Sequence, residues 1–368
     1  MSTHNANNER IKRRYLSFLK EAKRQSVASI DAVAKALNRF EVDTKFRDFK
    51  SFHIEQAIAF KKHMTEQRSQ QTGEILSKAT LHSTFAGLKR FFQWLADQPG
   101  YRSRLQYSDA EYFNLSEKDV RVATARHDKE GPILDQVKHV ITSMPTNTDI
   151  ARRNRALIAF TLLTGARDSA IASIKLKHID LIAGCVHQDA REVKTKFSKT
   201  FTTYFFPVGS EINQIVAEWV TYLRQEMLWS NDDPLFPATR IELGSERQFK
   251  AVGLDRKHWS TAAPIRGIFR DAFVAAGLPY FNPHSFRKTL VRLGEERCQN
   301  PEQFKSWSQN LGHEGVLTTF YSYGTVAVHR QGEIIKSLGQ CSSTNDTTIS
   351  AKARALMREL LQAEVGNP

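Results

Sequence analysis

Cysteine and long apolar segments are scarce in this sequence. Its 368 residues include three cysteines, Cys185, Cys298 and Cys341, which lie far apart and form neither a disulfide framework nor a Cys-x-x-Cys metal or redox motif. The longest apolar run, residues 156–166, is shorter than the roughly 20 residues that span a bilayer. Residues 1–14 are polar and then basic, without the apolar stretch of a signal peptide. We therefore expect a cytoplasmic protein with no membrane association.

The sequence also has fewer acidic than basic residues. Lys and Arg total 53 against 39 Asp and Glu, which gives a formal net charge of +14. This excess favours a polyanionic partner such as nucleic acid, because each phosphate that a cation neutralises releases counterions. The alternative is a basic protein without a specific partner. The sequence has no Gly-x-x-x-x-Gly-Lys-Ser/Thr loop for a nucleotide phosphate.

Hydrophobic periodicity predicts two domains. Between residues 81 and 95, Phe85, Leu88, Phe92 and Leu95 recur at helical spacing, and similar stripes precede them among basic residues. The pattern is lost before residue 131, and a Ser/Thr-rich stretch near the end precedes an amphipathic segment that Ser350 caps. We predict a helical domain with a basic face over 1–115, a linker over 116–131, a second domain over 132–340, and a tail with a helix over 341–368.

The second domain is predicted to be mainly helical with a small sheet near its start. Residues rich in Thr, Tyr and Phe favour strands over 180–187 and 200–208. Apolar spacing favours helices over 133–144, 152–163 and 211–227, and a mostly helical chain from there to residue 338.

Three short segments carry candidate functional side chains. Arg167 follows Thr164-Gly165-Ala166 at the end of an apolar helix, where a glycine makes a sharp bend. His284 and Arg287 follow Asn282-Pro283, a strong helix start. They share a helix face with Val291, and the packing stripe of Phe286, Leu290 and Leu293 lies elsewhere, so we expect the pair to face a ligand.

The third segment lies at the end of a helix that begins at Asn300-Pro301. Gly312 is predicted to end it and to place His313 in the turn beyond, and Tyr321 and Tyr323 follow. Each of these features alone has an ordinary structural explanation: an arginine near a helix end, a satisfied histidine, a half-buried tyrosine.

Together and in this order, the motifs resemble those of the tyrosine recombinases, the phage integrase family. That pattern has an Arg after a Thr-Gly-x turn, a Lys in a β-hairpin, His-x-x-Arg, Leu-Gly-His and a Tyr some nine residues on. The resemblance covers nearly the whole chain, including residues 77–95 at the end of the first domain. It implies a mainly α fold with a small antiparallel sheet, arranged as a two-domain C-shaped clamp with a helical core-binding domain.

The resemblance also implies a function. A tyrosine oxygen attacks a DNA phosphodiester and forms a 3′-phosphotyrosine, without metal, ATP or other cofactor. The partners would be double-stranded DNA and further copies of the chain, a dimer on each site and a tetramer in synapsis, with the tail helix docked on an adjacent subunit. Two alternatives stay open: a type IB topoisomerase that reseals the same strand, and a DNA-binding protein that keeps the fold without catalysis.

Residue roles follow from the same resemblance. Arg167 and Arg287 would hold the phosphate, and Lys196 or Lys194 would protonate the leaving oxygen. His284 would assist proton transfer from the tyrosine, and His313 would hydrogen-bond a non-bridging oxygen. The nucleophile is Tyr323 or Tyr321, which lie one residue beyond and one short of the usual interval; the surroundings of Tyr323 fit better. The expected DNA contacts outside the catalytic set are Lys89, Arg90, Lys199 and Lys288.

One position departs from the family pattern. The acidic residue usual three positions after the first arginine is Ala170 here, and Asp168 lies on the wrong side of the turn to replace it. If Asp168 does not compensate, we expect Arg167 to be held in place only once DNA is bound.

Overall fold

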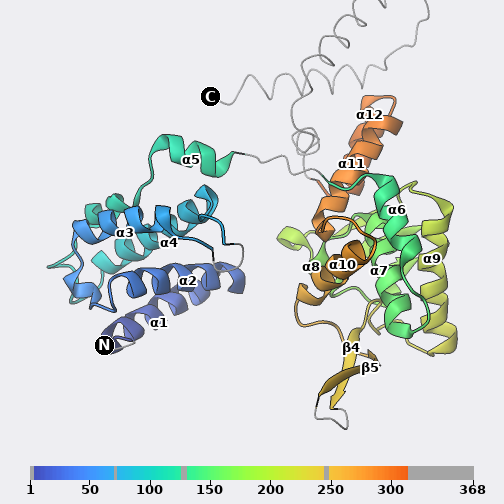
Figure 1. The fold of residues 1–368 in the computed structure, drawn as a ribbon, viewed down its shortest axis with the longest axis horizontal. Helices are drawn as coiled ribbons and strands as arrows, with labels where there is room; N and C mark the ends of the chain where they lie inside the picture. The colour runs from blue at the N-terminus through green and yellow to red at the C-terminus, as the bar shows by residue number, and fades with distance from the viewer. Residues whose placement is uncertain (1–3, 70–72, 126–130, 244–247, 314–368) are drawn as a thin grey trace, which may run out of the picture. The chain divides into compact units, whose positions relative to one another are not determined.

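The computed structural model describes residues 4–69, 73–125, 131–243 and 248–313 (Figure 1). The chain divides into two compact units, Met1–His127 and Asp128–Pro368. Among the described residues, no helix combines the length and apolar character that crossing a bilayer requires.

The first unit is a bundle of helices around an aromatic core. Helix α4 runs down its centre and contacts α2, α5 and η2. Phe92 of α4 packs against Phe40, Phe52 and Phe113, with ring centroids 4.2–5.3 Å apart. The predicted apolar stripe of α4 is confirmed, because all its members are buried. The elements are α1 (Ala6–Glu21), α2 (Val27–Asp43), η1 (Phe49–Ser51), α3 (Ile54–Glu66), α4 (Lys78–Ala96), η2 (Tyr107–Phe113) and α5 (Glu117–Thr124).

Part of the expected linker is helical. Ser116 caps α5 by accepting a hydrogen bond from the backbone N–H of Asp119, and Glu117 and Asp119 place negative charge in the first turn. The helix is short, and none of its residues is buried. This stretch lacks an apolar stripe because its helix is exposed and packs no side chain into the core. Local capping stabilises the helix instead.

The second unit is built around α7. Every residue of α7 from Ala156 to Thr164 is buried, and the helix contacts α6, α9, α11 and β5. The predicted helices are confirmed to within a few residues, although the last turn of the predicted 211–227 helix is a π-helical segment. The elements are α6 (Leu134–Ser143), α7 (Asp149–Thr164), α8 (Asp168–Ile171), η3 (Leu176–His178), η4 (Lys196–Ser198), α9 (Ser210–Thr221), η5 (Tyr222–Glu226), α10 (Ala263–Ala275), η6 (Pro283–Ser285), α11 (Phe286–Arg297) and α12 (Pro301–Asn310).

An antiparallel sheet in the order β1-β2-β3 lies between α8 and α9 in the chain. Its strands are β1 (Ile179–Asp180), β2 (Cys185–Gln188) and β3 (Phe201–Tyr204), and β2 pairs with β3 from Cys185↔Tyr204 to Gln188↔Phe201. Asn310 fixes the end of α12 to β3, because its side chain accepts from the Tyr204 N–H at 2.7 Å and its carbonyl accepts from Thr203 at 3.2 Å. The sheet thus connects the β2–β3 loop to the end of α12.

A second hairpin corrects the prediction of a mostly helical chain after residue 227. Strands β4 (Ala238–Leu243) and β5 (Phe249–Asp255) pair antiparallel and project from the body of the second unit (Figure 1). Arg153 of α7 anchors its base by donating to the Pro237 carbonyl at 2.8 Å and to the Thr239 hydroxyl at 3.0 Å. The fold class itself is confirmed: the described chain is mainly helical with small antiparallel sheets.

Candidate active site

Arg167 stands directly after a tight turn at the end of α7. Gly165 adopts φ +61°, the left-handed region, and a Cβ there would lie 2.9 Å from Leu311 Cδ2 and 3.0 Å from Leu290 Cδ1. Thr164 braces the turn by donating its hydroxyl to the Phe160 carbonyl at 2.7 Å and accepting from the Ala166 N–H at 3.2 Å. The turn therefore needs glycine, and it presents Arg167 at a fixed place as the N-cap of α8.

Arg287 joins this turn to the Leu311–His313 turn. Its guanidinium donates to the Gly165 carbonyl at 2.8 Å, to the Leu311 carbonyl, and to Nε2 of His313 at 2.8 Å. The residue is 6% exposed, which corrects the expectation of an open His/Arg face; Val291 is buried as well, and His284 is the exposed member. One side chain thus brings three sequence-distant motifs together.

The turn that carries His313 is shaped by Gly312. Gly312 has φ +70°, and a Cβ there would lie 2.8 Å from the ring of Phe201 in β3. The His313 N–H donates to the Ser308 carbonyl at 3.2 Å, which closes the end of α12. The prediction that Gly312 ends this helix and places His313 just beyond it is confirmed.

Positive charge is concentrated among these residues, because the charges of Arg167 and Arg287 both act on His284 and His313. Burial, with the charge of Arg167 nearby, lowers the pKa of Arg287 to about 9. Burial, followed by Arg287 and Arg167, lowers the pKa of His313 to about 4. The exposed His284 is partly desolvated, and this desolvation, followed by the same two arginines, lowers its pKa. Both imidazoles are therefore held neutral near pH 7. A cluster whose cations are desolvated and mutually repelling is suited to bind an anion.

The low pKa of His313 gives a pH prediction. A phosphate bound at the two arginines is expected to raise the His313 pKa by more than one unit, because negative charge stabilises the imidazolium. In the free protein the folded state binds fewer protons than the unfolded state between about pH 4 and the ordinary histidine value near 6.5, so stability falls as pH drops through that window. Histidine NMR titration with and without DNA measures both values; a free-protein pKa above 6 would contradict the account.

The electrostatic contacts of the two candidate lysines differ. Both lie in the β2–β3 loop, as predicted for a hairpin lysine. The charge of Lys196 lowers the pKa of both His284 and His313, whereas the charge of Lys194 acts on His258. Lys196 is exposed, and its ammonium lies 4.7 Å from the ring centroid of Phe197. These contacts favour Lys196 as the lysine that belongs with the histidine pair.

Support for Arg167 differs from the family pattern. Ala170 is buried, and Asp168 pairs with Arg266 of α10, at 2.8 Å to Nε and 2.7 Å to a terminal nitrogen. The guanidinium of Arg167 has no hydrogen bond or ion pair among the described residues. Partial burial lowers its pKa. Asp168 thus does not bind Arg167, and the side chain is free to take a ligand.

Some of the remaining predicted residues lie outside the described part of the chain, and the others differ in their contacts and exposure. Tyr321, Tyr323 and the tail helix lie outside the described residues. Lys89 binds Glu111 at 2.7 Å and the side chain of Asn114 at 3.0 Å in its own unit, while Arg90 is exposed, and Lys199 and Lys288 are half-buried. Within the described ranges, no cluster of three or more His, Cys, Asp or Glu side chains is arranged to hold a metal ion.

A family model decides the classification. The model described as "Phage integrase family" matches residues 134–325, more than half of the chain. The chain belongs to the phage integrase family. As a member, it is a tyrosine-type site-specific recombinase that breaks and rejoins DNA.

Relatives and solved structures agree with this family. The chain is 26% identical over 252 residues to tyrosine recombinase XerC of Lactobacillus delbrueckii subsp. bulgaricus, covering 67% of this chain and 72% of the relative. It is 22% identical to XerC of Escherichia coli O157:H7, covering 68% and 71%. By fold it is similar to a lambda integrase dimer bound to a core site, with TM-score 0.56, 10% identity and coverage of 87% and 99%. It is also similar to the Tn1549 transposon integrase in complex with circular intermediate DNA, with TM-score 0.57, 13% identity and coverage of 89% and 99%.

Proposed function

We propose that this recombinase cuts DNA by attack of a tyrosine, Tyr323, on a phosphodiester held between Arg167 and Arg287. The observation that carries the proposal is the position of Arg287. It is hydrogen-bonded to the Gly165 carbonyl two residues before Arg167 and to His313. The charge of Arg167 is close enough to lower the Arg287 pKa. Two planar guanidinium groups are suited to bind the oxygens of one phosphate.

The chemical step follows from the charge state of each group. The tyrosine oxygen forms a bond to phosphorus, the bond from phosphorus to the 5′ oxygen breaks, and the strand keeps a 3′-phosphotyrosine. His284 is neutral near pH 7, so it is able to accept the phenolic proton. Lys196 supplies a proton to the leaving 5′ oxygen. His313 is hydrogen-bonded to Arg287 through Nε2, and in this proposal its imidazole donates a hydrogen bond to a non-bridging oxygen.

DNA binding outside the site is proposed for Arg90, Lys89, Lys199 and Lys288. Arg90 is exposed on α4 and is available for a phosphate, whereas Lys89 must exchange Glu111 for DNA. The DNA-bound dimer of the lambda integrase supports the proposal that this chain also acts as a dimer on each site. A tetramer that joins two such sites in synapsis is part of the same proposal. We propose that the protein acts in the cytoplasm, on the DNA of a chromosome or a mobile element.

A covalent-adduct assay tests the proposed chemistry. The probe is a library of nicked duplexes with a randomised centre, from which strands that stay attached to the denatured protein are recovered and sequenced. We expect the wild-type chain to select a site, and Tyr323→Phe to reduce adduct on that site by about 10⁴-fold or more, because the nucleophile is lost.

Tyr321→Phe is the matched control for this assay. It removes the same hydroxyl two residues away, and we expect it to retain the adduct. The reverse result would make Tyr321 the nucleophile. An adduct that persists in both single variants would contradict the assignment of either tyrosine. Strand relaxation without exchange between two sites would indicate a topoisomerase, and DNA binding without any adduct would indicate a non-catalytic protein.

A further inference from the structure

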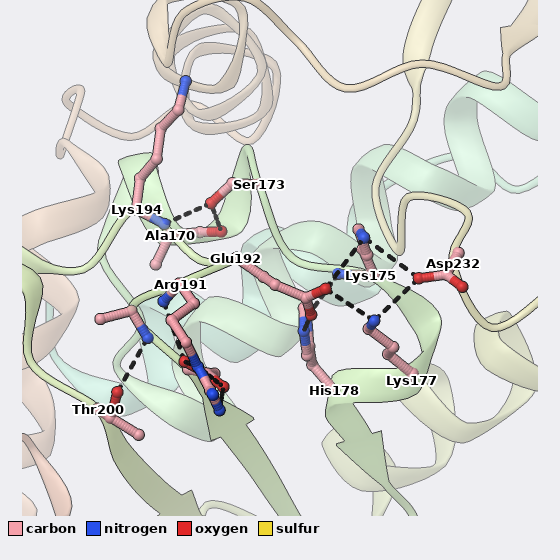
Figure 2. A network of polar contacts seen from close by, with 12 residues as sticks. Ala170, Ser173, Lys175, Lys177, His178, Arg191, Glu192, Lys194, Thr200 and Asp232 are labelled. Atoms are coloured by element: carbon pink, nitrogen blue, oxygen red, sulfur yellow. Dashed lines mark hydrogen bonds and ion pairs between the residues drawn. The ribbon is translucent and has the colours of Figure 1, made fainter.

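The β2–β3 loop is attached to the rest of the second unit by a polar cluster at its start, in which His178 is buried while Lys177 and Glu192 are exposed. The carboxylate of Glu192 accepts from Lys177 Nζ at 2.8 Å and from His178 Nε2 at 2.8 Å, and Lys175 Nζ lies 3.5 Å away (Figure 2). We call these four residues the Glu192 clamp. Together, the cations and hydrogen bonds lower the pKa of Glu192 to about 2, so the carboxylate is ionised throughout the neutral range.

The partners of Glu192 form a fixed platform. His178 is 4% exposed, and its Nδ1 accepts from the Lys175 N–H at 2.9 Å, which leaves Nε2–H to donate to Glu192. The backbone of η3 is bound in turn to residues 231–233, through Lys177 N–H to the Asn231 carbonyl at 2.8 Å and Leu176 N–H to the Asp233 carbonyl at 3.0 Å. The clamp therefore ties the loop to a part of the unit that is itself anchored.

A second set of bonds ties the same stretch to α8 and to Ser173 just beyond its end. The Lys194 N–H donates to the Ser173 hydroxyl at 2.8 Å, and the Lys194 carbonyl accepts from the Ser169 hydroxyl at 3.2 Å. Val193 between the two anchors is buried. Figure 2 shows the Lys194 side chain extending away from the Glu192 clamp. Since α8 begins immediately after Arg167, these bonds set the distance between the loop and the phosphate-binding arginine.

The loop beyond these anchors is exposed. Lys196, Phe197 and Ser198 lie at the surface, and Phe197 and Ser198 adopt φ +59° and +50°. The loop is next fixed at Thr200, whose hydroxyl accepts from the Ala190 N–H at 3.0 Å. The position of Lys196 therefore depends on the anchors at 192–194.

We propose that Glu192 is a positioning residue for the catalytic lysine, and that its clamp holds the first half of the β2–β3 loop so that Lys196 reaches the leaving 5′ oxygen. This inference rests on the proposed function, in which Lys196 is the general acid. It assigns no contact between Glu192 and DNA.

Glu192→Gln tests the inference, because the amide keeps the shape and loses the charge that the two lysines and His178 bind. On the selected DNA site we expect cleavage to slow by about 10- to 100-fold, since a misplacement of about 1 Å costs up to 10²-fold, while DNA affinity changes by less than about threefold. The decisive readout is a substrate with sulfur at the 5′ bridging position. A thiolate leaves without a proton, so the variant is expected to cleave it at a rate within about threefold of wild type.

Further variants separate positioning from general damage. Asp232→Asn is the matched control, because Asp232 binds Lys177 at 2.9 Å and Lys175 at 3.2 Å without belonging to the loop, and we expect wild-type cleavage. The double variant with Lys196→Ala is expected to be no slower than Lys196→Ala alone, since both changes remove the same proton transfer. If Glu192→Gln fails to fold, Ser173→Ala loosens the second anchor and is expected to show the same sulfur rescue.

The outcomes distinguish this inference from the proposed function. Wild-type rates for Glu192→Gln on the ordinary substrate, or equal losses on the oxygen and sulfur substrates, would overturn the positioning role. Absence of adduct from the wild-type chain on either substrate would overturn the proposed function, and the inference with it.

Discussion

Replacing Arg287 with lysine is expected to slow DNA cleavage by about 10²- to 10³-fold, the range seen when one preorganised donor to a developing charge is removed. Lysine keeps the positive charge. A single ammonium, however, is unable to span the Gly165 carbonyl, the Leu311 carbonyl, His313 and a phosphate as the planar guanidinium does. The measurement is the single-turnover rate of adduct formation on the selected site.

Arg292→Lys is the matched control for Arg287→Lys. Both residues lie on α11, and Arg292 is exposed, so the same chemical change there is expected to leave the rate within about twofold of wild type. A rate for Arg287→Lys within tenfold of wild type would show that charge alone is sufficient at this position, and the geometric role of Arg287 would be wrong.

Gly165→Ala is expected to destabilise the second unit by about 3 kcal/mol. Holding a non-glycine residue in the left-handed region costs about 1 kcal/mol, and forcing a methyl group into a packed site costs a further 1–3 kcal/mol. Leu311 Cδ2 and Leu290 Cδ1 would lie 2.9 and 3.0 Å from the added Cβ. Because the chain has two units, native-state hydrogen exchange of the α7 amides is the measurement, since it reports on the second unit itself.

Gly277→Ala separates the two contributions. Gly277 has φ +73° in the same unit, and a Cβ there meets nothing within 4 Å. We therefore expect a loss of about 1 kcal/mol from backbone strain alone. Equal losses at the two positions would show that the close packing of Leu311 and Leu290 on the Arg167 turn does not contribute.

Local chemistry made much of the site predictable. Gly165 and Gly312 both end helices in the left-handed region, which a glycine after an apolar helical stripe indicates without knowledge of the fold. Asn282 caps the turn before α11 by accepting from the Ser285 N–H, as predicted from Asn-Pro. The order of the motifs along the chain then assigned these short segments to one site. The family resemblance depends on that order and needs no knowledge of which segments are in contact.

Contacts between distant segments were not predictable in the same way. Helical spacing placed Arg287 on a face away from the packing stripe, yet its hydrogen-bond partner Gly165 is 122 residues away, and the turns at 165 and 311 bury it. Similarly, the Glu192 clamp depends on His178, which lies 14 residues earlier in the chain. A single acidic residue in a polar loop carries no periodic signal that would predict this contact.

The β4–β5 hairpin was missed for a different reason. Its one-face alternation, Ile241 and Leu243 opposite Ala251 and Phe249, spans few residues, and these side chains are exposed instead of joining the core. Periodicity is most informative where a face is buried over several turns or strands, as in α4 and α9. In an exposed hairpin, only a few apolar residues alternate with charged ones. So short a pattern is also compatible with a helix.

The most direct test of the central claim compares Arg167→Ala with wild type on two substrates, one with an ordinary scissile phosphate and one in which a methylphosphonate removes its negative charge. The Arg167 side chain has no hydrogen bond or ion pair in the described part of the chain, so the variant deletes a charge without breaking a polar contact there. If this guanidinium serves to neutralise the phosphate, the variant loses about 10²- to 10³-fold on the ordinary substrate, and that loss shrinks at least about tenfold on the neutral one. An equal loss on both substrates would contradict the account.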